Sequence, residues 1–125
     1  MTKRIHHVGL AVEKIEPVAE FWEEVLGGKM LDYEMETPEF FSRMMQVGQG
    51  VFELLEPRGE NGLIEKFLKS RGEGIHHVSM VVDDVKEVIK TCEEKGVKMM
   101  WNRFIHPKSA HGVLIEIIDK SEAGG

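Results

Sequence analysis

The chain has 125 residues, of which 42% are hydrophobic and 30% are charged, and its formal net charge is −6. That length predicts one globular domain over residues 1–125. No apolar run approaches the roughly 20 residues of a membrane-spanning helix, and lysine and arginine are scattered, so neither a membrane nor nucleic acid is expected as a partner. The single cysteine excludes an internal disulfide, and no signal-like start is present, so a cytoplasmic protein is expected.

The predicted elements of the first part of the chain follow the order strand, helix, strand, strand, strand. The β-branched stretch 5–12 predicts a strand, and apolar residues at helical spacing predict a helix from residue 15 to the glycines at 27 and 28. Three more strands are predicted at 29–35, 41–48 and 51–57, where turn residues separate them. Residues 1–57 therefore form a first βαβββ module, and residues 58–74 form a connector with a short helix.

The second part of the chain repeats the first, so that Ile75 takes the place of Ile5. Between positions 5 and 24, eight side chains are identical to their counterparts between positions 75 and 94. The repeat predicts a strand over 75–82 and a helix that begins after Asp84 and ends at Gly96. Only two or three strands fit between that helix and residue 120, so the second module, residues 75–120, is shortened by about one strand.

Four polar residues stand within these apolar strands. Strand alternation places His7 on a face with small residues, and His77 takes the equivalent place in the repeat. Glu53 and Glu116 lie within VFELLE and VLIEII, where an unpaired buried carboxylate would be strongly destabilising. Two imidazoles and two carboxylates suit a divalent transition ion, so the four are predicted metal ligands. Taken singly, each is better explained as a packed histidine or a solvent-facing glutamate.

These patterns together predict an α+β fold of two βαβββ-like modules. An internal pseudo-twofold would relate the modules and form a curved sheet around the metal site. His6 and His76, on the opposite strand face, are expected to pack or to support the ligands. The stretch of chain from His77 to Glu116 is shorter than the stretch from the first histidine ligand to its glutamate, which again indicates a shortened second module.

The paired modules, the HHV sequences at 6–8 and 76–78, and GVLIE at 112–116 resemble the vicinal oxygen chelate superfamily, which includes glyoxalase I and extradiol dioxygenases. FELLEP, IEKFLKSRGEGIHHVSMVVDD and HPKSAHGVLIEI are similar to the methylmalonyl-CoA epimerase family, over residues 5–119 in all. The resemblance implies His7, His77 and Glu116 as metal ligands, with Glu53 at the remaining ligand position. It implies one divalent ion, most typically cobalt, with manganese, nickel, zinc or iron as alternatives.

The same resemblance implies a function, which is metal-dependent inversion of C2 in methylmalonyl-CoA or a close acyl-CoA by a homodimer. The chemistry removes a proton beside a thioester carbonyl and stabilises the resulting enolate oxygen. Family members with an assigned base carry a carboxylate on the strand before the glutamine or glutamate ligand, but FSRMMQVG has none. To act as the acid/base group, Glu53 or Glu116 would therefore have to leave or share the metal, or a base must come from elsewhere.

A second departure from the family is the stretch WNR at 101–103, which stands where a further strand and a glycine-rich loop are usual. This predicts a more open site or a wall supplied by a partner subunit. Lys108 is a candidate contact for a CoA phosphate, and Arg43 is a candidate partner for a substrate carboxylate. Trp22 and Trp101 are interpreted as packing residues.

Other functions stay open at this point. Glyoxalase-type isomerisation of a glutathione hemithioacetal would use the same ligands and differ only in substrate. A ferrous dioxygenase would use two histidines and one glutamate. A non-catalytic small-molecule binding protein of the same fold would agree with the shortened second module and the missing base.

Overall fold

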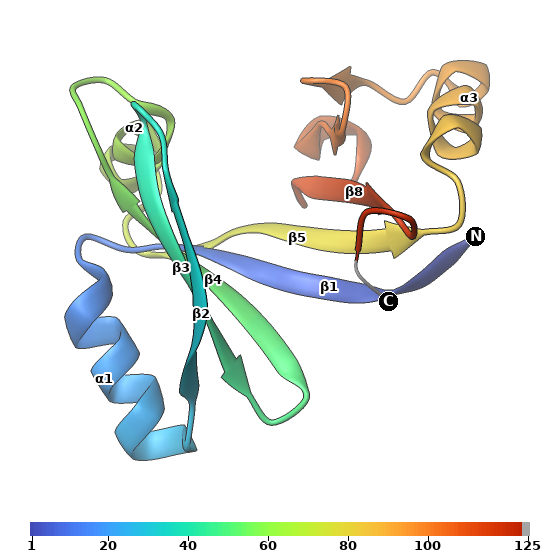
Figure 1. The fold of residues 1–125 in the computed structure, drawn as a ribbon. Coiled ribbons are helices and arrows are strands. Elements are labelled where there is room, and N and C mark those ends of the chain that lie inside the picture. Colours follow the sequence, from blue (N-terminus) through green and yellow to red (C-terminus); the bar gives the residue numbers. More distant parts are fainter. Residues whose placement is uncertain (124–125) are drawn as a thin grey trace. The chain divides into compact units, whose positions relative to one another are not determined.

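The structure is a computed structural model that describes residues 1–123. Its backbone forms two compact units, one of Val8–His76 and one of Met1–His7 with the chain from His77 on. The strands β1 (Thr2–Ala11) and β5 (Gly74–Val82) contribute to both units. Within the described residues, three α-helices and eight strands with mixed pairing confirm the predicted α+β class (Figure 1). None of the described helices has the length and apolar character that crossing a membrane requires.

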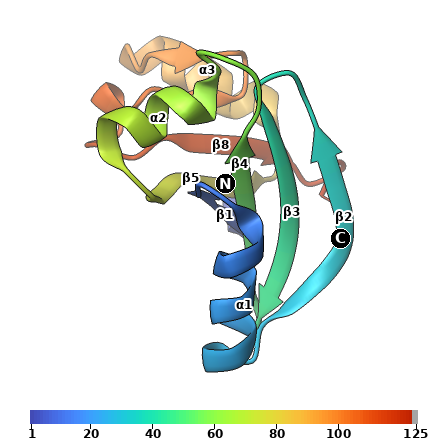
Figure 2. The same cartoon turned by 90° about the vertical axis from the view of Figure 1, so that its left-hand side faces the viewer.

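The unit Val8–His76 has helices on both faces of its strands. Its strands are the end of β1, β2 (Lys29–Glu36), β3 (Phe40–Val47) and β4 (Gly50–Pro57). They pair in the order β2-β3-β4-β1, and only β4 and β1 are parallel. The helix α1 (Ile15–Leu26) covers fully buried Met45 and Leu54 on one face. The helix α2 (Leu63–Arg71) lies beside these strands (Figure 2). On the face opposite α1, its Ile64 packs against Ala11 and Leu55.

The other unit holds the second module and the first residues of β1. Its further elements are most of β5, α3 (Val85–Lys95), β6 (Met99–Met100), β7 (Phe104–Ile105), the 3-10 helix η1 (Pro107–Ser109) and β8 (Ile115–Asp119). Here β8 runs parallel to β5 and antiparallel to β7, and α3 packs on the face that carries Val82 and Ile117. The predicted shortening falls on β6 and β7, which keep two residues each, so all three strands after the helix are present.

The ends of α1 and α3 follow the sequence prediction. Gly27 and Gly96 both adopt the left-handed conformation, with φ of 70°, which ends each helix without the Cβ clash that other residues would meet. The side chain of Asp84 accepts a hydrogen bond from the backbone N–H of Lys86 and caps the start of α3.

A carboxylate on the last strand of each module also binds the first residue of its helix. Oε1 of Glu56 accepts a 2.9 Å hydrogen bond from the N–H of Ile15, and Oδ2 of Asp119 accepts one of 3.1 Å from Val85. Each carboxylate stands three residues after the predicted ligand glutamate of its own strand. We call Glu56 and Asp119 the helix anchors. They satisfy backbone donors that no residue within the helix can reach.

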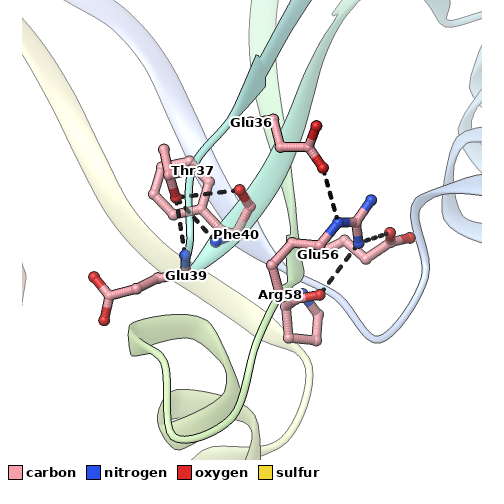
Figure 3. Close-up of polar contacts among 7 residues, drawn as sticks. Glu36, Thr37, Glu39, Phe40, Glu56 and Arg58 are labelled. Carbon is pink, nitrogen blue, oxygen red and sulfur yellow. Dashed lines mark hydrogen bonds and ion pairs between the residues drawn. The ribbon is translucent and has the colours of Figure 1, made fainter.

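Arg58 holds the first helix anchor in place. Its Nη1 donates to Oε2 of Glu56 at 2.7 Å, and its Nε lies 3.4 Å from Oε2 of Glu36 (Figure 3). Burial alone would raise the pKa of Glu56, but the hydrogen bonds from Arg58 and from the N–H of Ile15 lower that pKa below its ordinary value. Glu56 is therefore ionised at neutral pH and can anchor the positive end of α1.

Candidate metal centre

Three of the four predicted ligands, His7, His77 and Glu116, converge within one compact unit. Ser79 on β5 is the register partner of Glu116 on β8, so Glu116 projects from the strand face that carries His77. The opposite face of the two strands is the one that α3 covers. Both imidazoles are buried at 5% exposure, and Glu116 is half-buried. The three side chains therefore share a face that the helix leaves available.

The distances among the three ligand atoms fit one divalent ion. Nε2 of His7 lies 3.3 Å from Nε2 of His77, and Oε1 of Glu116 lies 3.8 and 3.9 Å from these nitrogens. A point equidistant from atoms at these separations is about 2.1 Å from each, which is the bond length of zinc to imidazole nitrogen and carboxylate oxygen. Two neutral imidazoles and a carboxylate are also a donor set that first-row ions accept.

Two further side chains orient these ligands. Ser79 is fully buried, and its hydroxyl donates to Oε1 of Glu116 and lies 2.9 Å from Nε2 of His7. Nδ1 of His6 lies 2.8 Å from Nδ1 of His7. When Nε2 of His7 is the ligand atom, the neutral ring carries its proton on Nδ1 and donates it to His6. The contact is what a residue supporting His7 would make, but that role of His6 stays a prediction. No pattern in the sequence indicated the contacts of Ser79.

Glu53, the fourth predicted ligand, lies in the other compact unit. It is 7% exposed, and its register partner on the parallel strand β1 is Gly9. That pair corresponds to the pair of Ser79 and Glu116, because Gly9 and Ser79 take equivalent places in the repeat. The register confirms that the two glutamates stand at equivalent strand positions, while coordination by Glu53 stays a prediction.

An aromatic pair adjoins the three ligands. Phe104 on β7 is the register partner of Glu116, and its ring centre lies 6.1 Å from that of His77. Trp101 follows with its ring centre 5.3 Å from that of Phe104. Trp101 packs against Phe104 as predicted, but it is 56% exposed and does so at the surface. Trp22, in contrast, packs against the cluster under α1, as predicted.

The two predicted substrate contacts lie in different settings. Lys108 in η1 is exposed, and its backbone N–H donates to Nδ1 of His106 at 3.0 Å. Arg43 on β3 pairs in register with Leu54, which places it on the face that α1 covers. Its Nε lies 3.7 Å from Oε1 of Glu34. Binding of substrate by Lys108 and Arg43 stays a prediction.

Arg43 also lines a cavity of about 550 Å³ beside α1. Four glutamates line the same cavity, namely Glu16, Glu20, Glu23 and Glu56. Their carboxylates create a negative potential that repels anionic ligands. The cavity is therefore a poor place for a phosphate or a substrate carboxylate, and the three converging ligands are the better candidate site.

The sequence is similar to a known protein family and to a named enzyme. The family model of the Glyoxalase/Bleomycin resistance protein/Dioxygenase superfamily matches residues 6–115. Mitochondrial methylmalonyl-CoA epimerase of Mus musculus is 30% identical over 128 residues, which cover 91% of this chain and 71% of that protein.

Solved structures agree in fold over nearly the whole chain. Methylmalonyl-CoA epimerase from Mycobacterium tuberculosis is similar with a TM-score of 0.84 and 28% identity, over 94% of this chain and 88% of that chain. A variant of the Streptomyces coelicolor methylmalonyl-CoA epimerase, in complex with 2-nitronate-propionyl-CoA, is similar with a TM-score of 0.84 and 26% identity, over 95% and 98% of the two chains.

Proposed function

Because the chain belongs to the glyoxalase/bleomycin resistance protein/dioxygenase superfamily, we propose that it is a metal-dependent epimerase that inverts C2 of methylmalonyl-CoA or a close acyl-CoA. The observation that carries the proposal is the convergence of His7, His77 and Glu116 around a point about 2.1 Å from each ligand atom. Cobalt is the ion we expect, with manganese, nickel, zinc and iron as alternatives, because all accept nitrogen and oxygen ligands.

Epimerisation requires a proton to leave C2 and a proton to return to the opposite face of the same carbon. A divalent ion bound here would act as a Lewis acid and stabilise the negative charge that develops on the thioester oxygen. His7 and His77 turn their Nε2 atoms towards one another, and the contact between His6 and His7 orients one ring. The hydroxyl of Ser79 binds Oε1 of Glu116 and keeps that carboxylate oriented.

Glu53 and Glu116 are the groups that we propose for proton transfer. The two carboxylates differ in environment, because Glu53 is 7% exposed and the Glu116 side chain is 27% exposed. Inversion needs one group on each face of C2, and a variant that lacks one group should exchange the C2 proton of one enantiomer without inverting it. Glu53→Gln and Glu116→Gln, each assayed on both enantiomers, test this assignment.

The proposed function is tested by deuterium incorporation at C2 of methylmalonyl-CoA in heavy water. Three preparations are compared, which are cobalt-loaded protein, metal-stripped protein and cobalt-treated His77→Ala. We expect exchange only in the first, because the other two lack the ion or one of its ligands. His111→Asn, which replaces an exposed histidine in a left-handed position, is the matched control and should exchange as the wild type does. Exchange that is independent of metal, or none above background in the loaded wild type, would refute the proposal.

The substrate class and the family also suggest the assembly. We propose that the protein acts on soluble acyl-CoA as a cytoplasmic homodimer, as the resemblance to the epimerase family implies. Light scattering during gel filtration would then give a mass twice that of one chain, and the mass of a single chain would contradict the proposal.

A further inference from the structure

The turn between β6 and β7 carries Trp101, and a contribution to the stability of the fold does not explain why this residue is a tryptophan. Trp101 and Asn102 have φ of 51° and 66°, in the left-handed region. Asparagine tolerates this conformation, but a bulky residue such as tryptophan adopts it at a cost. Trp101 is also 56% exposed, so its indole loses much of the free energy that burial would provide. A strained, exposed aromatic of this kind is better explained by contact with a ligand.

The indole is connected to the metal ligands by a row of rings. Phe104 stands on the ligand face, because Glu116 is its register partner, and it meets the ring of His77 edge to face at 80°. Trp101 meets Phe104 edge to face at 82°. The two centroid separations, 6.1 and 5.3 Å, place the indole centre within about 11 Å of the His77 ring centre. Edge-to-face packing holds this row on the side of the strands where the ligands lie.

We propose that Trp101 binds the pantetheine arm of an acyl thioester whose carbonyl group lies at His7, His77 and Glu116. This inference rests on the proposed function, which places a thioester carbonyl at the metal ligands. Because the indole centre lies no more than about 11 Å from the His77 ring centre, it is within reach of the methylene and amide groups that follow the sulfur. Those groups gain from contact with an exposed indole face, whereas a free dicarboxylate has no arm to reach it. Trp101 thereby selects thioesters over free acids.

Binding is measured through Trp101 itself. The chain has two tryptophans, so Trp22→Phe leaves Trp101 as the one indole reporter. Four probes are titrated into this metal-loaded variant, which are methylmalonyl-CoA, methylmalonyl-pantetheine, methylmalonate and adenosine 3′,5′-bisphosphate. We expect a saturable blue shift of the emission with the two thioesters and none with the other two probes. A response to the nucleotide alone, or to no probe, would overturn the inference.

Kinetics give a second and independent readout. Trp101→Asn removes the indole but keeps a residue that accepts the left-handed turn. We expect the KM for methylmalonyl-CoA to rise roughly tenfold while kcat and the affinity for cobalt stay unchanged, because the indole contacts only the arm. Trp101→Phe should restore part of the loss. Phe21→Ala is the matched control, because Phe21 is 54% exposed on α1, and its KM should equal that of the wild type.

The outcomes separate this inference from the proposed function. Metal-dependent deuterium exchange with unchanged KM in Trp101→Asn and no emission change would refute the binding role and leave the epimerase intact. A thioester-specific emission change without any exchange would support the binding role and refute the epimerase. A fall in kcat or in cobalt affinity in Trp101→Asn would show that Trp101 supports the metal centre instead and would overturn the inference.

Discussion

Replacing Ser79 by alanine tests whether this strand face is organised to hold a metal ion. The Ser79 hydroxyl is fully buried and contacts Glu116 and His7 directly. A hydrogen bond to a charged group contributes about 1.5–3 kcal/mol. Loss of a contact that orients a metal ligand weakens metal affinity by roughly 10–100-fold, which is about 1.4–2.7 kcal/mol. The two magnitudes agree, so Ser79→Ala should raise the Kd for cobalt by one to two orders of magnitude.

Ser42 provides a matched control for this experiment. It is likewise fully buried on a strand, but within the residues that the structure describes its hydroxyl has no hydrogen-bond partner. A dry, unpaired hydroxyl costs about 1–3 kcal/mol, so Ser42→Ala should leave stability unchanged or raise it. Its cobalt affinity should equal that of the wild type, because Ser42 belongs to the unit that does not hold the three ligands.

Competition with a fluorescent chelator at one fixed pH measures the Kd, because metal binding to histidine depends on pH. Urea unfolding of the metal-free proteins measures stability separately. If Ser79→Ala bound cobalt as tightly as the wild type, or if both serine variants weakened binding equally, the proposed role of the hydroxyl would be wrong.

Three further predictions concern the helix anchor Asp119, removal of the metal ion, and the contact of His6 with His7. Hydrogen bonds from the backbone N–H groups of Ser121 and Val85, and from the Ser121 hydroxyl, lower the pKa of Asp119 from 3.8 to about 2. Its stabilisation is therefore complete above the ordinary pKa and is lost as pH falls towards 2, so urea unfolding should show Asp119→Asn less stable than the wild type at pH 7 and equal to it near pH 2. Chelation should lower the Tm of the metal-loaded wild type but not that of His77→Ala, as differential scanning calorimetry would show. His6→Ala should weaken cobalt binding by roughly 10–100-fold, less than His77→Ala does, and equal losses in a calorimetric titration would contradict a merely supporting role.

The three side chains that come together could be selected from the sequence for a physical reason that the structure makes visible. His7 and His77 stand out because each occupies the same place in an apolar strand of the repeat, and Glu116 stands out because a carboxylate interrupts VLIEII. Side chains along a strand alternate between its two faces. The local backbone alone is therefore enough to separate the face of the candidate ligands from the face that the helix covers. The same reasoning gives no sign of Ser79, because a serine on a face of small residues indicates only a small side chain.

Other features depend on pairing that no local pattern determines. The face on which Arg43 lies follows from its register with Leu54, and a shift of one residue would move it to the other side. The exposure of Trp101 could not be predicted, because it follows from a turn with two left-handed residues between strands of two residues each. Such a turn depends on how far β6 and β7 extend, which tertiary contacts decide.

The position of the helix anchor on β8 bears on which mutations the fold can accept. On β8 the candidate ligand Glu116 and the anchor Asp119 are an odd number of residues apart, so one short strand places the candidate ligand on one face and the support for the start of a helix on the other. A mutation that shifts this strand would displace both side chains at once. The turn at 101–103 holds neither of these two carboxylates, although the carbonyl of Arg103 accepts a 2.8 Å hydrogen bond from the N–H of Ile117 on β8. A substitution at Trp101 can therefore change the proposed substrate contact while both carboxylates stay in place.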